Sequence, residues 1–291
     1  MNAPSKWLVG ARPRTLPAAV VPVAVGAACA SGLDGVVWWR APVALVVSLA
    51  LQVGVNYAND YSDGIRGTDD ARVGPVRLVA SGLASPRAVK LAAFSAFGVA
   101  AVAGLVVAVA TSPWLLVVGV AALLAGWFYT GGPKPYGYLG LGELFVFVFF
   151  GLVATVGTTF AVSEKVTALA VILGSGVGAL ACALLVINNL RDIPTDRLVG
   201  KMTLAVRLGD RRTRWLYLTL ITLAFAGVIV AAVTFRPWTA IAVIAAAFAV
   251  PPVRRVLRGA TGRDLIAVLG ETGRLQMAYG LLAAIGLLLS R

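Results

Sequence analysis

Long stretches without a charged residue are the feature that most limits how this chain can fold. They cover 15–33, 41–59, 91–133, 144–163, 166–190, 215–235, 237–253 and 275–290. An α-helix needs about 20 apolar residues to cross the hydrocarbon core of a bilayer. Each stretch fits one crossing except 91–133, which fits two because Thr111-Ser112-Pro113 would break a helix there. The sequence predicts an all-α polytopic membrane protein, a single domain (1–291) with about nine transmembrane helices.

The positions of lysine and arginine predict the orientation of these helices. With the N-terminus in the cytoplasm, all 25 lysines and arginines fall on the cytoplasmic side except Arg40, Lys165, Arg236 and Arg291. Such an excess of basic residues is typical of cytoplasmic loops. We therefore expect a multi-pass protein of the cell membrane, with the N-terminus cytoplasmic and the C-terminus outside. The net charge of +13 follows from this topology, so no nucleic-acid partner is needed.

The acidic residues gather on the same side, which the rule for basic residues does not require. Of the 12 carboxylates, only Asp34 and Glu164 fall on the outer side. The chain has no histidine, which excludes imidazole metal sites, and Cys29 and Cys182 lie within predicted spans, which argues against a thiolate site. A bound metal must therefore use oxygen ligands, which indicates a hard cation such as Mg²⁺. We expect the chemistry at the cytoplasmic end.

Four oxygen-bearing side chains follow one another where the second predicted span ends. Asn56, Asn59, Asp60 and Asp63 have offsets of 0, 3, 4 and 7, so they lie on one stripe of a helix. The stripe would present its side chains in one direction just as the helix leaves the bilayer.

A comparable group ends the sixth predicted span. Asn188, Asp192 and Asp196 have offsets of 0, 4 and 8, which again gives one stripe if the helix persists. Pro194 either begins a new helical segment or ends the span and breaks the stripe. Both groups contain Asn-x-x-x-Asp, a weak hint of internal duplication.

Two acidic helix ends at one side of a membrane need an explanation. Ionisable groups at the end of a helix bundle are costly and usually functional, although solvated loops with incidental acids are the simpler alternative. Mg²⁺ takes one or two carboxylates and completes its shell with water and phosphate oxygens. We therefore interpret Asp60, Asp63, Asp192 and Asp196 as ligands of Mg²⁺ that would bind a diphosphate.

A third cytoplasmic loop joins the fourth and fifth predicted spans. It runs from Tyr129 to Tyr138 through glycines and prolines, with Lys134 as its only base. A phosphate or substrate contact for Lys134 is one interpretation. A membrane anchor is the other.

Taken together, these residues resemble the UbiA superfamily of membrane prenyltransferases. The first pattern of that superfamily appears as Asn59-Asp60-Tyr61-Ser62-Asp63, and the second resembles Asp192 to Asp196 with Gly200-Lys201. One position departs from the superfamily pattern: Gly67 stands where a third acid would be, and Asp69 and Asp70 follow it. Within the superfamily, the chain is most similar to the branch that prenylates 1,4-dihydroxy-2-naphthoate. This similarity rests on residues 12–17, on 56–70 with Arg72, Gly74-Pro75 and Arg77, and on 188–203.

The resemblance implies nine helices around a central cavity, with both acidic motifs at its cytoplasmic end. It implies Mg²⁺-dependent transfer of a polyprenyl group from polyprenyl diphosphate to the naphthoate ring, with release of CO₂ and diphosphate. On this hypothesis Asp69 or Asp70 orients or deprotonates the acceptor, and Lys134 acts in catalysis. The residues expected to bind substrate are Asn56, Asn59, Arg72, Arg77, Tyr129, Tyr138, Asn188 and Lys201. Phe145, Phe147, Phe149 and Phe150 would either shelter a carbocation or pack against lipid and core.

Three other functions would leave different residue patterns in the sequence. A CDP-alcohol phosphotransferase fails because the glycine it requires after Ala71-Arg72 is Ser81, and no acid follows before Glu143. A transporter would need ionisable groups or broken helices near the bilayer midplane; the uncharged stretches show none, but the glycines within the spans keep this alternative open. A related enzyme with another aromatic acceptor stays open.

Overall fold

The computed structural model describes residues 3–68 and 74–290, and these residues form helices, turns and loops without a strand. The all-α prediction is therefore confirmed. The α-helices are α1 (Ala3–Ala11), α2 (Pro17–Ala30), α3 (Arg40–Ile65), α4 (Pro86–Ala110), α5 (Trp114–Phe128), α6 (Gly142–Val146), α7 (Ala154–Ser163), α8 (Ala168–Leu198), α9 (Leu204–Thr234), α10 (Ala246–Leu257) and α11 (Asp264–Leu289). Three short 3₁₀ segments, η1 (Pro13–Thr15), η2 (Tyr136–Leu139) and η4 (Pro237–Ala245), and one π-helix, η3 (Phe147–Val153), complete the order.

The described residues contain seven helices that are long and apolar enough to cross a membrane. A pair of helices bent by 51°, Lys6–Thr15 and Pro17–Ala30, would bring the number to eight. α5 is a further apolar helix, but it has only 15 residues. A multi-span membrane protein is thus borne out, while the count of nine and the orientation of the termini stay predictions.

Two local predictions about helix ends have different outcomes. The break at 111–113 is confirmed, since α4 ends at Ala110 and α5 begins at Trp114. Pro194 does not end the sixth span, because α8 continues through it to Leu198. The stripe of Asn188, Asp192 and Asp196 therefore persists on one continuous helix.

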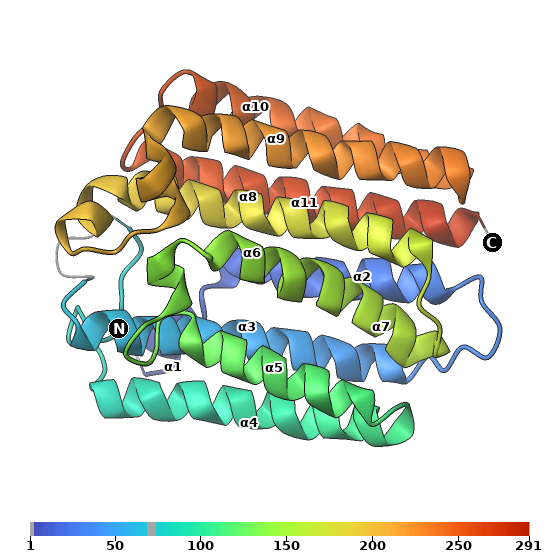
Figure 1. The fold of residues 1–291 in the computed structure, drawn as a ribbon, viewed down its shortest axis with the longest axis horizontal. Helices are drawn as coiled ribbons and strands as arrows, with labels where there is room; N and C mark the ends of the chain where they lie inside the picture. The colour runs from blue at the N-terminus through green and yellow to red at the C-terminus, as the bar shows by residue number, and fades with distance from the viewer. Residues whose placement is uncertain (1–2, 69–73, 291) are drawn as a thin grey trace.

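The long helices run roughly side by side, and both acid-bearing ends lie at the same end of the bundle (Figure 1). α3 and α8 both finish on the left in that view, where α9 and α11 begin. The α4–α5 and α7–α8 connections lie at the opposite end. The topology thus brings the two acidic motifs to one mouth of the bundle.

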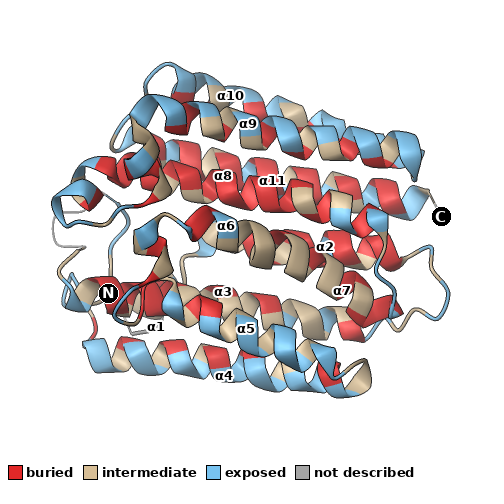
Figure 2. Cartoon of the chain, in the orientation of Figure 1, coloured by how far each residue is buried: buried red, intermediate tan, exposed pale blue. Residues whose placement is uncertain are grey.

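Burial follows the pattern of a bundle surrounded by lipid (Figure 2). α8 runs through the middle and is mostly buried, whereas α4, α5 and α9 expose one face. Those faces are apolar; Val109 is 80% exposed, Trp114 76% and Val233 83%. Exposed apolar surface on this scale marks contact with a membrane or partner, and the length of the helices indicates a membrane.

The two acid-bearing helices end in the same way. In α8, Gly200 has a φ of 73°, and the Lys201 amide donates to the Asp196 carbonyl at 2.9 Å. In α3, Gly67 has a φ of 70°, and the Thr68 amide donates to the Asp63 carbonyl at 3.1 Å. Both are Schellman motifs, in which a left-handed glycine closes the helix and the next residue turns back. This is why glycine stands at position 67, where the superfamily pattern would have an acid.

Candidate active site

A cavity of about 720 Å³ lies inside the bundle. Asp63, Asp192 and Lys201 line its polar end. Most of its remaining wall consists of apolar side chains from the neighbouring helices. A cavity with a charged end and an apolar interior suits an amphiphile that has a charged head and an apolar tail.

Lys201 joins the two acidic motifs. Its ammonium nitrogen lies 3.6 Å from a carboxylate oxygen of Asp63 and 3.9 Å from one of Asp196. The Schellman turn after α8 places it there, because it directs the residue after Gly200 back over the helix end. Residues more than 130 positions apart in sequence thus share one cation, which is the convergence that the two stripes predict.

Asp63 is almost fully buried, and a tyrosine holds one of its oxygens. The Tyr138 hydroxyl donates to the carboxylate at 2.8 Å. Burial, and secondarily the Asp63 charge, raises the pKa of Tyr138, so its hydroxyl stays protonated as a donor. The ammonium of Lys201 lies 5.0 Å from the centre of the same ring. Tyr138 therefore positions both the carboxylate and the cation at the mouth.

Asp192 is paired with its own neighbour. The Arg191 guanidinium contacts both carboxylate oxygens, at 2.7 and 2.8 Å, and both side chains are buried. A β-carbon at position 74 would lie 3.4 Å from the Arg191 guanidinium carbon, an ordinary van der Waals distance, so the loop at Gly74 lies beside this ion pair. Arg191 was not among the predicted site residues, although a base beside a candidate ligand could have indicated it.

Asp60 has a different environment from that of Asp63. Its two carboxylate oxygens accept the backbone amides of Leu78 and Val79, at 2.9 and 3.0 Å, and it is fully buried. It does not line the cavity, whereas Arg77, next to these amides, does. A carboxylate that accepts two backbone amides is well suited to hold a loop. Its predicted role as a metal ligand is untested, and its contacts favour positioning of the 74–79 segment.

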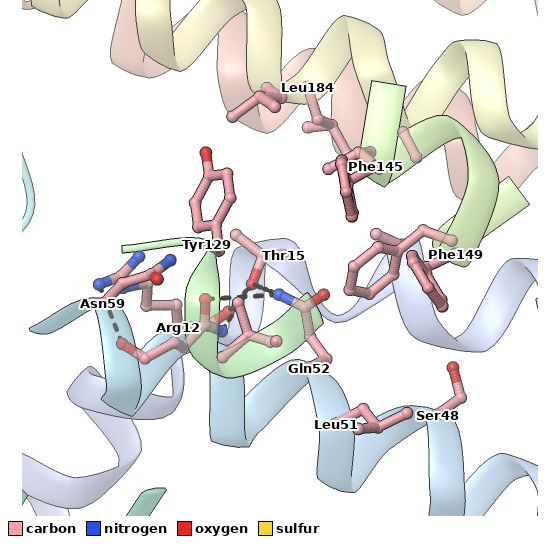
Figure 3. Close-up of a pocket in the computed structure, with 18 of the residues that line it drawn as sticks. Arg12, Thr15, Ser48, Leu51, Gln52, Asn59, Tyr129, Phe145, Phe149 and Leu184 are labelled. Atoms are coloured by element: carbon pink, nitrogen blue, oxygen red, sulfur yellow. Dashed lines mark hydrogen bonds between the residues drawn. The ribbon is translucent and has the colours of Figure 1, made fainter. Parts of the chain in front are cut away.

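The predicted asparagines line the cavity but bond chiefly to the protein itself. The Asn56 amide donates to the Ala11 carbonyl at 2.9 Å and to the Thr15 hydroxyl at 3.0 Å. The Gln52 amide also donates to the Thr15 hydroxyl (Figure 3). Asn59 accepts from the Thr130 hydroxyl at 2.8 Å. The side chain of Asn188 faces the cavity and donates weakly to a carbonyl of its own helix. Sequence reasoning missed Thr15 and Gln52, since neither has an ionisable group.

A row of aromatic rings leads from the mouth into the cavity. Ring centres are 5.5 Å apart for Tyr129–Tyr136, 3.9 Å for Tyr136–Phe145 and 6.1 Å for Phe145–Phe149. Figure 3 shows Tyr129 standing out into the open space with its hydroxyl towards α8. Burial, followed by the nearby Glu143 charge, raises the pKa of Tyr129 well above its ordinary value, so the hydroxyl is a neutral donor. Of the predicted phenylalanines, Phe147 does not line the cavity.

The remaining predicted residues have three different outcomes. Arg77 lines the cavity. Lys134 is exposed and does not line it, so the 129–138 loop joins the site through its tyrosines instead. The predictions for Asp69, Asp70 and Arg72 lie outside the described residues.

The donor set fits a metal that is shared with a substrate. Among residues 3–68 and 74–290, no three acidic or cysteine side chains are close enough to hold a metal by themselves. Mg²⁺ does not need such a cage, because it binds one or two carboxylates and leaves its other positions to water and phosphate. The carboxylates of Asp63 and Asp196, with the ammonium of Lys201 near both, form the kind of acidic gap that a cation occupies.

The model of the UbiA prenyltransferase family matches residues 19–288. The chain belongs to this family. The resemblance found in its acidic motifs is thereby confirmed over almost the whole length.

Curated relatives show which branch of the family is most similar. The chain is 52% identical to the 1,4-dihydroxy-2-naphthoate octaprenyltransferase of Mycobacterium tuberculosis, over 96% of each chain. It is 37% identical to the protein of that name in Escherichia coli, over 72% of this chain and 70% of the relative.

Solved structures share the fold at lower sequence identity. A UbiA homolog from Aeropyrum pernix K1 has a TM-score of 0.71 and 16% identity, over 94% of this chain and 97% of the other. A UbiA homolog from Archaeoglobus fulgidus bound to GPP and Mg²⁺ has a TM-score of 0.65 and 14% identity, over 96% and 99%. These similarities show that the family fold is present.

Proposed function

We propose that this protein transfers a polyprenyl group from polyprenyl diphosphate to 1,4-dihydroxy-2-naphthoate in menaquinone biosynthesis. The new carbon–carbon bond forms at the ring carbon that carries the carboxylate. Diphosphate and CO₂ leave, and the product is demethylmenaquinol, the reduced form of demethylmenaquinone. The identity of 52% to a relative of that name, over 96% of both chains, supports this acceptor.

The observation that carries the proposal is the position of Lys201 between Asp63 and Asp196, at the polar end of an apolar cavity. Two helix ends that share one cation can also share a metal–diphosphate group. Asp63, Asp192 and Asp196 would hold Mg²⁺, which when bound neutralises the charge that develops on the leaving diphosphate. The solved homolog from Archaeoglobus fulgidus bound to GPP and Mg²⁺ is consistent with such a group.

The cationic side chains at the mouth would contact the phosphates. Lys201 and Arg77 line the cavity, and each can donate charge-assisted hydrogen bonds to phosphate oxygens. Arg72 and Lys134 belong to the same proposal as further phosphate contacts, and Asp69 as a group that orients the acceptor. When a metal enters, Lys201 would turn from the two carboxylates to the phosphate, because the metal then supplies their neutralising charge.

The apolar interior would hold the prenyl chain, with the aromatic row beside its reacting end. Phe145 and Phe149 stack along the wall, and ring faces stabilise a nearby positive charge. Asn56, Asn59, Asn188 and the hydroxyls of Tyr129 and Tyr138 would orient the substrates by neutral hydrogen bonds. In this arrangement the allylic cation forms next to aromatic faces and away from water.

The protein would lie in the plasma membrane with this mouth on the cytoplasmic side. The distribution of basic residues supports the orientation. The acceptor would then come from the cytoplasm and the prenyl chain from the bilayer.

An acceptor assay tests the function. Purified protein in liposomes with Mg²⁺ and labelled polyprenyl diphosphate should prenylate 1,4-dihydroxy-2-naphthoate at least tenfold faster than 4-hydroxybenzoate. EDTA should abolish the reaction, and Mg²⁺ should restore it. Faster prenylation of the benzoate would contradict the proposed acceptor but not the assignment as a prenyltransferase. No transfer to any aromatic acid would contradict the prenyltransferase assignment itself.

A further inference from the structure

A second cavity, of about 710 Å³, lies between the start of α2, α10 and the first half of α11. Among the described residues it shares only Arg14 and Ile266 with the central cavity. Its charged side chains are those of Arg14, Arg255, Arg274 and Glu271. We call it the arginine groove. None of the reaction chemistry described above uses it.

The three arginines lie at one level along the bundle, each on a separate element. Arg14 is the last charged residue before the uncharged stretch of α2, and Arg274 is the last before the uncharged part of α11. Arg255 follows directly after the uncharged stretch 237–253 and Arg254. Arginines at such boundaries lie at the headgroup level of a bilayer. The groove therefore opens where lipid phosphates are found.

The charges in the groove leave a positive excess. Arg255 is 3.4 Å from a carboxylate oxygen of Glu271, and this is the ion pair that the groove contains. The side chains of Arg14 and Arg274 make no hydrogen bond or ion pair with any residue that the structure describes, and both are exposed. Three guanidinium groups and one carboxylate give the groove a formal charge of +2. Such a site attracts an anion.

The apolar part of the groove lies on the hydrocarbon side of the arginines. Met277 is one turn beyond Arg274 in α11 and is 41% exposed. Phe248 is two turns before Arg255 in α10 and is 48% exposed. A ligand here meets guanidinium groups at one level and apolar side chains below it. That order matches a phospholipid, whose phosphate and acyl chains are stacked in the same way.

We propose that the arginine groove binds the headgroup of an anionic phospholipid. Basic pockets between membrane helices on the cytoplasmic side recognise anionic headgroups by the same chemistry. A free phosphate would use the arginines but not Phe248 and Met277. Because Arg14 and Ile266 also line the central cavity, the bound lipid contacts a wall of the reaction cavity from outside.

Lipid retention by the full-length protein tests the proposal. Protein in neutral detergent is mixed with dioleoyl phosphatidylglycerol or dioleoyl phosphatidylcholine, and bound lipid is counted by native mass spectrometry. The double variant Arg255→Gln/Arg274→Gln should bind phosphatidylglycerol about 30-fold more weakly than the parent, while phosphatidylcholine binding is unchanged. The matched control Arg258→Gln/Arg263→Gln removes two exposed arginines outside the groove and should bind like the parent.

Three results would overturn the proposal. Equal losses in the groove and control variants would mean that net charge alone attracts the lipid. Equal retention of the two lipids by the parent would remove the headgroup specificity. If glycerol phosphate or the naphthoate acceptor raises the melting temperature of the protein as much as phosphatidylglycerol does, the groove is a small-anion site. If the double variant does not fold, Arg274→Gln alone, at an exposed position, should still lose about fivefold in phosphatidylglycerol binding.

Discussion

At the scale of single residues, the two aspartates of the first motif have separate roles. Asp63 faces Lys201 and Tyr138 at the cavity, whereas Asp60 accepts two backbone amides beneath it. Both are buried, so burial alone does not distinguish them. Their partners distinguish them. The Asp63 carboxylate faces a side-chain cation that a metal can replace, whereas the Asp60 carboxylate could bind a metal only if the loop that donates its backbone amides moved.

This division predicts opposite effects for two equivalent substitutions. Asp63→Asn should lower prenyl transfer by about 10²–10³-fold without loss of thermal stability, since it removes charge from the leaving-group site. Asp60→Asn should destabilise the fold by about 1–3 kcal/mol, because its new amide group faces a backbone donor. Turnover at saturating Mg²⁺ and thermal unfolding in the same detergent measure both effects. A large loss of turnover in Asp60→Asn with unchanged stability would instead make Asp60 a ligand.

At the scale of elements, two matching helix ends build the site. Each ends in a left-handed glycine, at position 67 or 200, and each has an aspartate four residues before that glycine. The turn after α8 delivers Lys201 to the cavity. The turn after α3 delivers Thr68, whose hydroxyl lies 3.4 Å from that of Tyr138. The hint of duplication in the two motifs therefore has a structural counterpart in the caps.

Gly200→Ala tests the contribution of the second cap. Gly200 and Gly259 have φ values of 73° and 89°, and a β-carbon at either would meet no atom within 4 Å. Alanine at either position should therefore lower the free energy of unfolding by about 1–2 kcal/mol through backbone strain, without a steric clash. Gly200→Ala should also lose about tenfold in turnover, because it displaces Lys201, while Gly259→Ala should keep the parental rate. Equal turnover rates in the two variants would mean that the position of Lys201 does not contribute to catalysis.

At the scale of the whole molecule, much of the architecture could be predicted from the sequence. Uncharged stretches predicted seven of the spans that the described residues contain, because a bilayer tolerates few charges. The offsets of Asp63 and Asp196 predicted stripes that do converge. The partner of Asp60 could not be predicted, since it depends on how the 74–79 loop folds back. The continuation of α8 through Pro194 could not be predicted either, because packing outweighs the missing amide. Lys201 was predicted from a resemblance, and its bridging position follows from the turn at Gly200.

The orientation in the membrane is a prediction at this same scale. Lys165 lies in the exposed α7–α8 connection, and Arg258 lies in the exposed turn after α10. With native Cys29 and Cys182 buried, a membrane-impermeant maleimide added to intact cells should label Lys165→Cys and not Arg258→Cys. Inverted vesicles should give the reverse pattern. Labelling of Arg258→Cys in intact cells would place the acidic mouth on the outer side.

We propose that carboxylates from α3 and α8 together hold one metal–diphosphate group. An experimental structure with Mg²⁺ and a non-reactive thio-analogue of a prenyl diphosphate tests it most directly. Mg²⁺ should lie about 2.0–2.1 Å from oxygens of Asp63 and of Asp192 or Asp196, with the ammonium of Lys201 moved onto the phosphates. A diphosphate bound by residues of only one of these helices, or bound elsewhere in the cavity, would contradict it.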